Sequence, residues 1–276
     1  MAARRTGILL LLFSAAAAVP PWTLAASEAA SSRLDALHAP FSELLARYVA
    51  HGRVDYPGLA RERAQLDAYL TALESVDGAT LQKASRSARI AYWINAYNAL
   101  MLRLVLDAWP VRKVLDIPSG DAKSLFDRPL FHSKARGEVL SLDAIEHQIL
   151  RKELKDPRIH FAIVCGARSC PPLRSEAYLG RELSRQLQDQ IHHFLVLGQG
   201  ARLQGGTLYL SKIFEWFAED FGGDTRRWIL PHLPPSLRKR ALRARVAYAE
   251  YDWTVNAQKL PSAPSGKATS SQPPAP

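Results

Sequence analysis

Apolar residues recur at three- and four-residue intervals along the first part of the chain, a spacing typical of amphipathic helices. It predicts three helices in succession, over about 34–48, 59–75 and 88–109. The third helix is apolar on most faces between Ile90 and Val105, so we expect it to be the central helix of the fold. Pro110 ends it.

Shorter runs with a different pattern follow. Residues 130–140 alternate around a glycine-containing turn, which predicts a hairpin, and residues 158–164 are β-branched and aromatic, which predicts a buried strand that ends at Cys165. Further helices are expected over 141–154, 181–197, 213–221 and 224–230, and further strands over 208–210 and 244–251. The predicted class is α+β, mostly helical, with a small, mainly antiparallel sheet around the long central helix.

The two ends of the chain differ from this pattern. Residues 1–26 begin with two arginines, continue through an apolar stretch and reach small residues, which predicts a cleaved signal peptide and a periplasmic or secreted protein. Residues 258–276 contain five prolines among small and polar residues, which predicts a disordered tail. The globular domain is therefore expected over 30–257.

The charge of the chain bears on its partners. With 36 Lys and Arg against 26 Asp and Glu the formal charge is +10, a balance that suits nucleic-acid binding. Removing the leader takes away two arginines and no acid, which leaves 34 basic and 26 acidic residues and a charge of +8. Because export separates the protein from intracellular nucleic acid, we expect no such partner. The basic cluster over 238–245 instead predicts peripheral contact with an anionic envelope surface.

Two cysteines are the first candidates for chemistry. Cys165 and Cys170 stand in a loop rich in Gly and Pro that follows the predicted strand. In an oxidising compartment such a pair usually forms a disulfide. The competing hypothesis makes Cys165 a thiolate nucleophile, which needs a nearby histidine as base and a third group to orient it.

Three histidines could serve this cysteine. His147 is the preferred base because Glu146 stands beside it to orient it, and His132 is an alternative. His160 lies five residues before Cys165 on the predicted strand, so the two side chains should point to opposite faces.

Two amides on the central helix are unusual for a buried element. Asn95 and Asn98 share one helix face. Either they are buried and bonded to backbone groups of neighbouring loops, or they line a site as donors to an oxyanion. In the second case the loop after Cys165 packs against this face, and Arg168, Ser169 and Tyr97 are expected to bind substrate.

Several functional classes lose support from missing motifs. The chain has no phosphate-binding G-x-x-x-x-G-K, no G-x-G-x-x-G, no G-x-S-x-G and no H-E-x-x-H sequence. The spacing of the two cysteines matches no closed zinc pattern. We therefore expect neither a metal nor a cofactor.

Four segments together resemble the DUF547 family, a domain of unknown function. They are YWINAYNAL over 92–100, SLDAIEH over 141–147, HFAIVCGARSCPPL over 160–173 and LSKIFEWF over 210–217. The resemblance spans about 40–255. It implies exported bacterial members, plant members in which the domain follows other sequence, and a fold similar to papain-like or transglutaminase-like hydrolases, which carry a thiol at the start of a central helix.

This resemblance leaves two functions open, because the central helix here has no thiol. Either the nucleophile has moved to Cys165, or the domain is a binding relative without catalysis. Plant members keep a cysteine at the place of Cys165 and have serine at that of Cys170, which favours a role for Cys165. The leading hypothesis is a thiol-dependent hydrolase or transferase acting on an amide or peptide. The alternative is a non-catalytic envelope-binding module whose loop is shaped by a Cys165–Cys170 disulfide and whose ligand is an envelope polymer.

Overall fold

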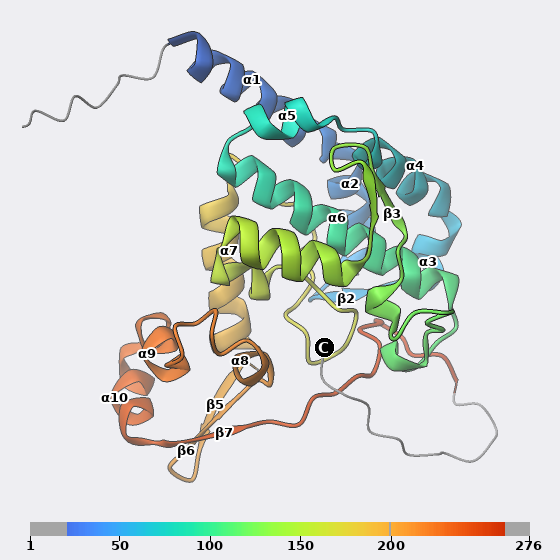
Figure 1. Cartoon of the computed structure of the whole chain (residues 1–276). Helices are drawn as coiled ribbons and strands as arrows, with labels where there is room; N and C mark the ends of the chain where they lie inside the picture. Colours follow the sequence, from blue (N-terminus) through green and yellow to red (C-terminus); the bar gives the residue numbers. More distant parts are fainter. Residues whose placement is uncertain (1–20, 199, 263–276) are drawn as a thin grey trace, which may run out of the picture.

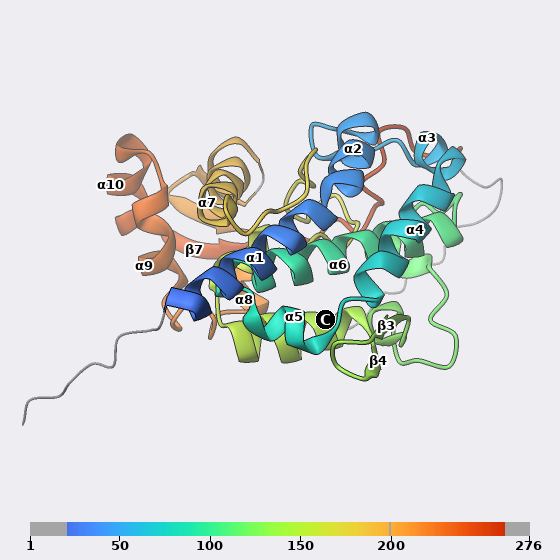
Figure 2. The ribbon, with the colours of Figure 1, turned by 90° about the horizontal axis from the view of Figure 1, so that it is seen from above.

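A long buried helix organises the molecule, as the sequence predicts. The computed structural model describes residues 21–262 except residue 199. Helix α6, Arg86–Asp107, begins where the side chain of Ser85 accepts a hydrogen bond from the Ala88 amide at 3.1 Å. Figure 2 shows α6 between the N-terminal helices and the π-helix η3, which follows later in the chain over Ala144–Leu154. The surrounding elements are α1 (Pro21–Leu37), α2 (Ala39–Tyr48), α4 (Arg63–Glu74), α5 (Gly78–Lys83) and the π-helix η3 (Ala144–Leu154).

The predicted N-terminal helices are each divided in two. The first breaks at His38, because Pro40 lacks the amide hydrogen that a continuous helix needs and stands in the first turn of α2. The second is divided into α3, Tyr56–Arg61, and α4, and a short helix, α5, was not predicted. These divisions let the chain turn around α6.

The strands form three small sheets, which confirms the α+β class. Two are antiparallel pairs, and the third joins an antiparallel pair to a parallel strand in the order β5-β6-β7. The strands are β1 (Val49–Ala50), β2 (Arg53–Val54), β3 (Phe131–Ser133), β4 (Glu138–Leu140), β5 (Ala201–Gln204), β6 (Thr207–Leu210) and β7 (Arg245–Tyr248). The hairpin predicted over 130–140 is β3–β4.

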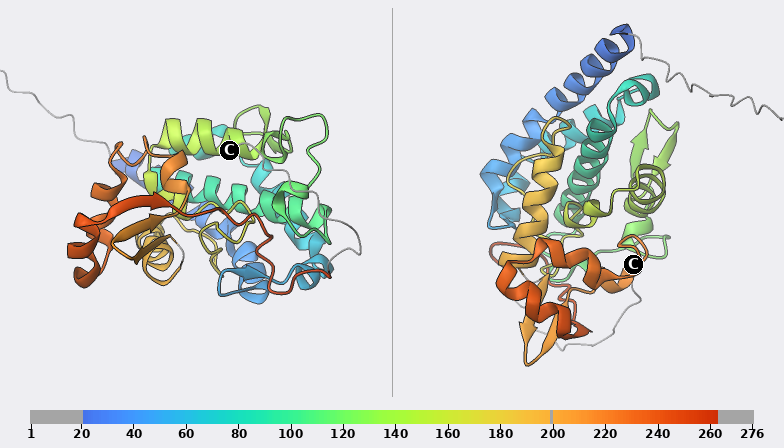
Figure 3. Two further views of the ribbon diagram at one scale, coloured as in Figure 1. Left: turned by 90° about the horizontal axis from the view of Figure 1, so that it is seen from below. Right: turned by 90° about the vertical axis from the view of Figure 1, so that its left-hand side faces the viewer.

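A second hydrophobic core lies under the three-stranded sheet. Figures 1 and 3 show this C-terminal lobe beside the larger helical lobe. Its helices are η5 (His193–Leu197), α8 (Ile213–Trp216), α9 (Thr225–Ile229), η6 (Leu230–His232) and α10 (Pro235–Arg243). Helix α7 (Leu183–His192) joins the lobes, because Leu183 and Leu187 pack in the larger core and Ile191 packs in this one. Helices α8 and α9 are shorter than predicted.

After β7 the chain returns to the larger lobe. Along this return, the amides of Val255, Asn256 and Gln258 donate to carbonyl groups of the larger lobe at 2.8–2.9 Å. The segment therefore ties the two lobes together and brings Tyr251 and Trp253 between them.

The strand predicted over 158–164 is wrong. Residues Pro157–Phe161 form a 3-10 helix, η4, which begins where the Asp156 carboxylate accepts from the Arg158 amide at 3.1 Å. The extended residues that follow do not pair with a strand. The side chain of Asn98 takes that place, because it accepts from the Val164 amide and donates to the Ala162 carbonyl, both at 2.9 Å.

Two further short helices, η1 (Val114–Asp116) and η2 (Leu125–Asp127), connect α6 to the hairpin.

Most of the predicted leader and of the predicted tail lies outside the described residues, whereas residues 21–26 belong to α1. In the part of the chain that the structure describes, no helix is long and apolar enough to cross a membrane.

Candidate functional site

A narrow cavity of about 50 Å³ lies where the two lobes meet. Helices η3 and η4, the loop after Cys165, helix α8 and the returning segment all contribute to its wall. Its apolar surface is largely aromatic, from Phe126, Trp216, Phe217, Tyr251 and Trp253. Its polar groups come from Tyr97, Asp143, Glu146, His147, His160 and the two cysteines. The cavity therefore holds several groups able to transfer protons within an apolar enclosure.

His160 is held at the centre of a charged cluster. Its Nε2 lies 2.7 Å from Oδ2 of Asp220, and its Nδ1 lies 3.8 Å from Oε1 of Glu146. The ring is buried and stacks on Phe217 with a centroid distance of 4.1 Å. An Nε2–H that donates to Asp220 leaves Nδ1 as the nitrogen able to accept a proton.

Asp220 is fixed from a second side by Arg151. The guanidinium donates from Nε at 2.5 Å and from Nη2 at 3.1 Å, a bidentate pair. Burial alone would raise the pKa of Asp220, but the hydrogen bonds from His160 and Arg151 lower it well below its usual range. Asp220 is therefore ionised at neutral pH and orients His160.

Glu146 has the opposite environment. Its carboxyl is almost fully buried, and this burial raises its pKa, although the nearby positive charges of His160, His147 and Arg151 oppose the change. Burial raises the pKa of Tyr97 as well, with a further contribution from Glu146. Two carboxyl groups whose pKa values are shifted in opposite directions suit an acid and a base in one site.

His147 has other partners than the predicted one. Its Nε2 lies 3.2 Å from Oδ1 of Asp143, which raises its pKa, and its Nδ1 lies 2.5 Å from Nη1 of Arg151. Glu146 faces His160 instead. Both predicted residues line the cavity, but the carboxylate that orients His147 is Asp143.

The two cysteines form a disulfide at the wall of the cavity. Their Cα atoms are 6.2 Å apart, Cys165 is half-buried, and Cys170 is buried. Cys170 Sγ accepts from the amide of Cys165 at 2.9 Å and from the hydroxyl of Tyr251 at 3.1 Å. Cys165 carries no thiol in this state.

Asn95 and Asn98 do not line the cavity. Asn95 donates to the Tyr178 carbonyl at 2.8 Å and accepts from its amide at 2.9 Å, in the same way as Asn98 bonds to residues 162 and 164. Both amides are buried. Of the two interpretations of these residues, the structure agrees with burial against loop backbone, and the predicted role as oxyanion donors has no support from their position.

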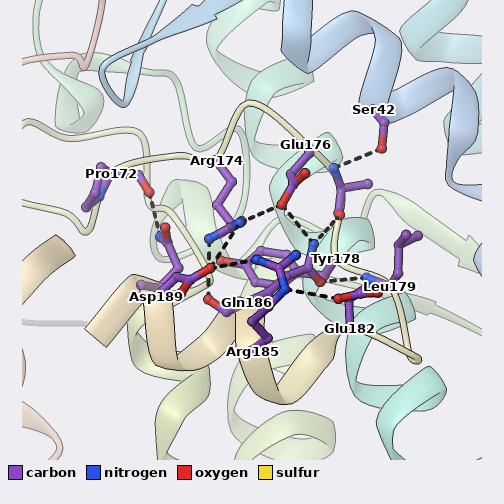
Figure 4. A network of polar contacts seen from close by, with 12 residues as sticks. Ser42, Pro172, Arg174, Glu176, Tyr178, Leu179, Glu182, Arg185, Gln186 and Asp189 are labelled. Carbon is purple, nitrogen blue, oxygen red and sulfur yellow. Dashed lines mark hydrogen bonds and ion pairs between the residues drawn. The ribbon is translucent and has the colours of Figure 1, made fainter. Parts of the chain in front are cut away.

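The loop after Cys165 is also held from its far end. Gln190 of α7 donates to the carbonyls of Pro172 and Phe161, at 2.8 and 3.0 Å. One turn earlier Gln186 donates to the Ala177 carbonyl and accepts from the Leu179 amide, both at 2.9 Å, within the polar network of Figure 4. The loop is thus positioned by side-chain amides on α6 and α7.

Arg168 and Ser169, the two predicted substrate-binding residues of the loop, do not line the aromatic cavity. The Arg168 amide donates to the Thr254 carbonyl at 2.7 Å, and Ser169 Oγ accepts from the Asp252 amide at 2.8 Å. Arg168 faces a separate groove, whose wall includes Cys170. Tyr97 does line the aromatic cavity.

Sequence reasoning gave no role to Asp220, Arg151 or the aromatic wall. It also gave less weight to His160 as a partner of Cys165 by strand parity, and this argument fails because residue 160 lies in the 3-10 helix η4. Asp220 follows the aromatic residues of α8 closely in the sequence, and this position could have indicated that it belongs to the site. Among the described residues, no group of three or more His, Cys, Asp or Glu side chains is arranged to hold a metal ion.

Comparison with known proteins gives a family match over part of the chain and no function. The chain matches no curated protein and no solved structure at a significant level. Residues 81–195 match the model of the family described as "Protein of unknown function, DUF547". This segment holds α6, η3 and the disulfide loop, while α8 and Asp220 lie beyond it. The chain therefore contains a DUF547 domain over residues 81–195, shorter than the span over which its motifs resemble the family.

Proposed function

We propose that this protein is an exported, thiol-dependent hydrolase or transferase that acts on an amide or peptide group in the aromatic cavity. Cys165 is the nucleophile once its disulfide has been reduced, His160 is the base, and Asp220 orients His160. The observation that carries the proposal is the hydrogen bond of 2.7 Å between His160 and Asp220 beside a cavity that Cys165 also lines. Cys165, His160 and Asp220 are residue types that can serve as nucleophile, base and orienting carboxylate in acyl transfer.

The chemistry begins with the disulfide. A dithiol reductant is oxidised to its own disulfide and leaves two thiols on the protein. His160 takes the proton of the Cys165 thiol on Nδ1, and the sulfur forms a bond to the carbonyl carbon of the amide. The C–N bond then breaks, and the amine leaves with the proton from His160. Water or a second amine attacks the thioester and releases Cys165.

Glu146 supports this cycle from the Nδ1 side of His160, opposite Asp220. Its carboxyl lies 3.8 Å from Nδ1, and its raised pKa favours the protonated form more than in an exposed glutamate. A protonated carboxyl in an apolar cavity can donate to a developing oxyanion.

Alkylation kinetics followed by mass spectrometry test the nucleophile. With dithiothreitol present, iodoacetamide should modify Cys165, and His160→Gln should slow this reaction by about 10²-fold, at the lower end for the loss of a general base. His132→Gln is the matched control, because His132 is an exposed histidine outside the cavity. Turnover of an amide library should need the reductant and be lost in Cys165→Ser. Turnover that persists in Cys165→Ser would overturn the proposal.

A second function, binding to an anionic envelope surface, is favoured by helix α10. The segment Pro235–Tyr248 has five basic residues, no acidic residue and the exposed apolar side chain of Leu242. Basic side chains near an anionic surface each contribute about 1 kcal/mol of binding, and salt screens this attraction. A disulfide, typical of an oxidising compartment, agrees with such a location.

Vesicle sedimentation tests this second function. The protein should bind vesicles that contain phosphatidylglycerol at low salt, release at high salt, and lose most binding when Lys239 and Arg243 are both changed to glutamate. Equal binding to vesicles of pure phosphatidylcholine would contradict it.

A further inference from the structure

A groove of about 240 Å³ lies on the far side of the disulfide loop from the aromatic cavity. Cys170 and Pro171 contribute to the walls of both, so the loop separates the two spaces. The lining of the groove includes His51, Arg53 and Arg168 and contains no carboxylate. Its electrostatic character is therefore positive.

The two arginines are close enough to repel each other. Burial and the charge of Arg168 both lower the pKa of Arg53, and Asp252 offsets only part of this effect. Within the described part of the chain, neither guanidinium forms a salt bridge or a hydrogen bond, whereas Arg47, Arg136 and Arg174 each pair with a glutamate. The Nε of Arg168 is buried and has no partner. A buried donor without an acceptor is costly, so the groove has unused binding capacity for a negative group.

The backbone holds both residues in place. Arg53 belongs to strand β2, whose residue Val54 donates to the Asn256 carbonyl at 2.9 Å. Arg168 lies between the two cysteines of the disulfide, and its amide donates to the Thr254 carbonyl. Both main-chain anchors use the returning segment, which therefore keeps the backbones of Arg53 and Arg168 on either side of the groove.

We propose that this groove binds an oxyanion, a phosphate or carboxylate group, between the guanidiniums of Arg53 and Arg168. Two arginines can supply parallel N–H donors to such a group, and the anion relieves the repulsion between them. His51, which is exposed, also lines the groove. The proposed thiol chemistry uses neither arginine, because neither lines the aromatic cavity.

Titration calorimetry on the full chain at low ionic strength tests the site with inorganic phosphate and with acetate as separate probes. Saturable binding of phosphate that is stronger than that of acetate assigns the groove to phosphate groups, and the reverse order assigns it to carboxylates. Arg168→Gln and Arg53→Gln should each weaken binding by about tenfold or more, as expected for a hydrogen bond to a charged group. Arg168→Lys should weaken binding less, because it keeps the charge and loses only the fork of donors.

Arg227→Gln is the matched control, since it removes the same charge from an exposed arginine of α9 that lines none of the described cavities. Its affinity should equal that of the unaltered protein. Far-UV circular dichroism of each variant shows whether the fold is kept. The proposal is overturned if neither probe gives saturable binding, or if the Arg227 variant loses as much affinity as the Arg168 variant.

Discussion

The side chain of Asn98 gives the sharpest test of how the disulfide loop is positioned. In Asn98→Ala the buried amide of Val164 and the buried carbonyl of Ala162 both lose their hydrogen-bond partner. Each buried polar group left without a partner costs about 1–3 kcal/mol, so the free energy of unfolding should fall by about 2–6 kcal/mol. This is a large part of the stability of a typical domain, about 5–15 kcal/mol.

Urea unfolding followed by tryptophan fluorescence measures this loss, and hydrogen exchange locates it. The Val164 amide should lose its protection from exchange in Asn98→Ala and keep it in Asn95→Ala. In Asn95→Ala the amide that loses its hydrogen-bond partner, and hence its protection, is that of Tyr178. Both variants should lose similar stability. A loss below about 1 kcal/mol for Asn98→Ala would refute the reasoning. Unchanged stability with reduced amide turnover would restore the role as an oxyanion donor.

Three further predictions concern titration and redox chemistry. Burial lowers the pKa of His38 to about 3 from its ordinary 6.5, so the unfolded chain takes up a proton that the native protein excludes. Stability should therefore fall by about 1.4 kcal/mol per pH unit from this group as the pH drops below about 6.5, and urea unfolding of His38→Gln should show a flatter acid limb. Because burial raises the pKa of Glu146, its ionised form opposes folding. The free energy of unfolding of Glu146→Gln, relative to that of the unaltered protein, should therefore increase as the pH rises. A difference in this free energy that is the same at pH 4.5 and pH 8 would contradict the prediction. Tyr251→Phe removes the hydroxyl that donates to Cys170 Sγ, the sulfur that leaves as a thiolate when the disulfide is reduced at Cys165. Reduction by dithiothreitol, followed by timed mass spectrometry, should therefore slow about tenfold. An unchanged rate would show that this hydroxyl does not stabilise the Cys170 thiolate.

The helical framework could be predicted because it depends on local patterns. Helix α6 is apolar on nearly all faces, and only a helix at the centre of a fold buries such a surface. The hairpin of residues 130–140 likewise has its alternation and its turn within one short segment. Helix boundaries were less accurate where a proline or a cap divides a continuous apolar pattern, as at His38.

The candidate site could be predicted only in part, because its contacts join distant segments. Asp220 lies 60 residues from His160 and 69 from Arg151, and no periodicity in the sequence connects them. The strand predicted over 158–164 failed for a related reason. Asn98 satisfies the backbone that a neighbouring strand would otherwise bond, and an isolated sequence gives no sign that a helix residue does so.

We expect the loop after Cys165 to keep its place when the disulfide is reduced. Closing a ring between residues five apart restricts the unfolded chain only slightly, by about 2 kcal/mol in the chain-entropy model. The amides of Asn98 and Gln190 make four hydrogen bonds to the backbone on either side of the cysteines. Because these contacts contribute at least as much as the disulfide, reduction should free Cys165 while the loop stays against the cavity. A Cys165 thiol freed in this way would lie in the wall of the cavity that His160 also lines, as the proposed nucleophilic role requires.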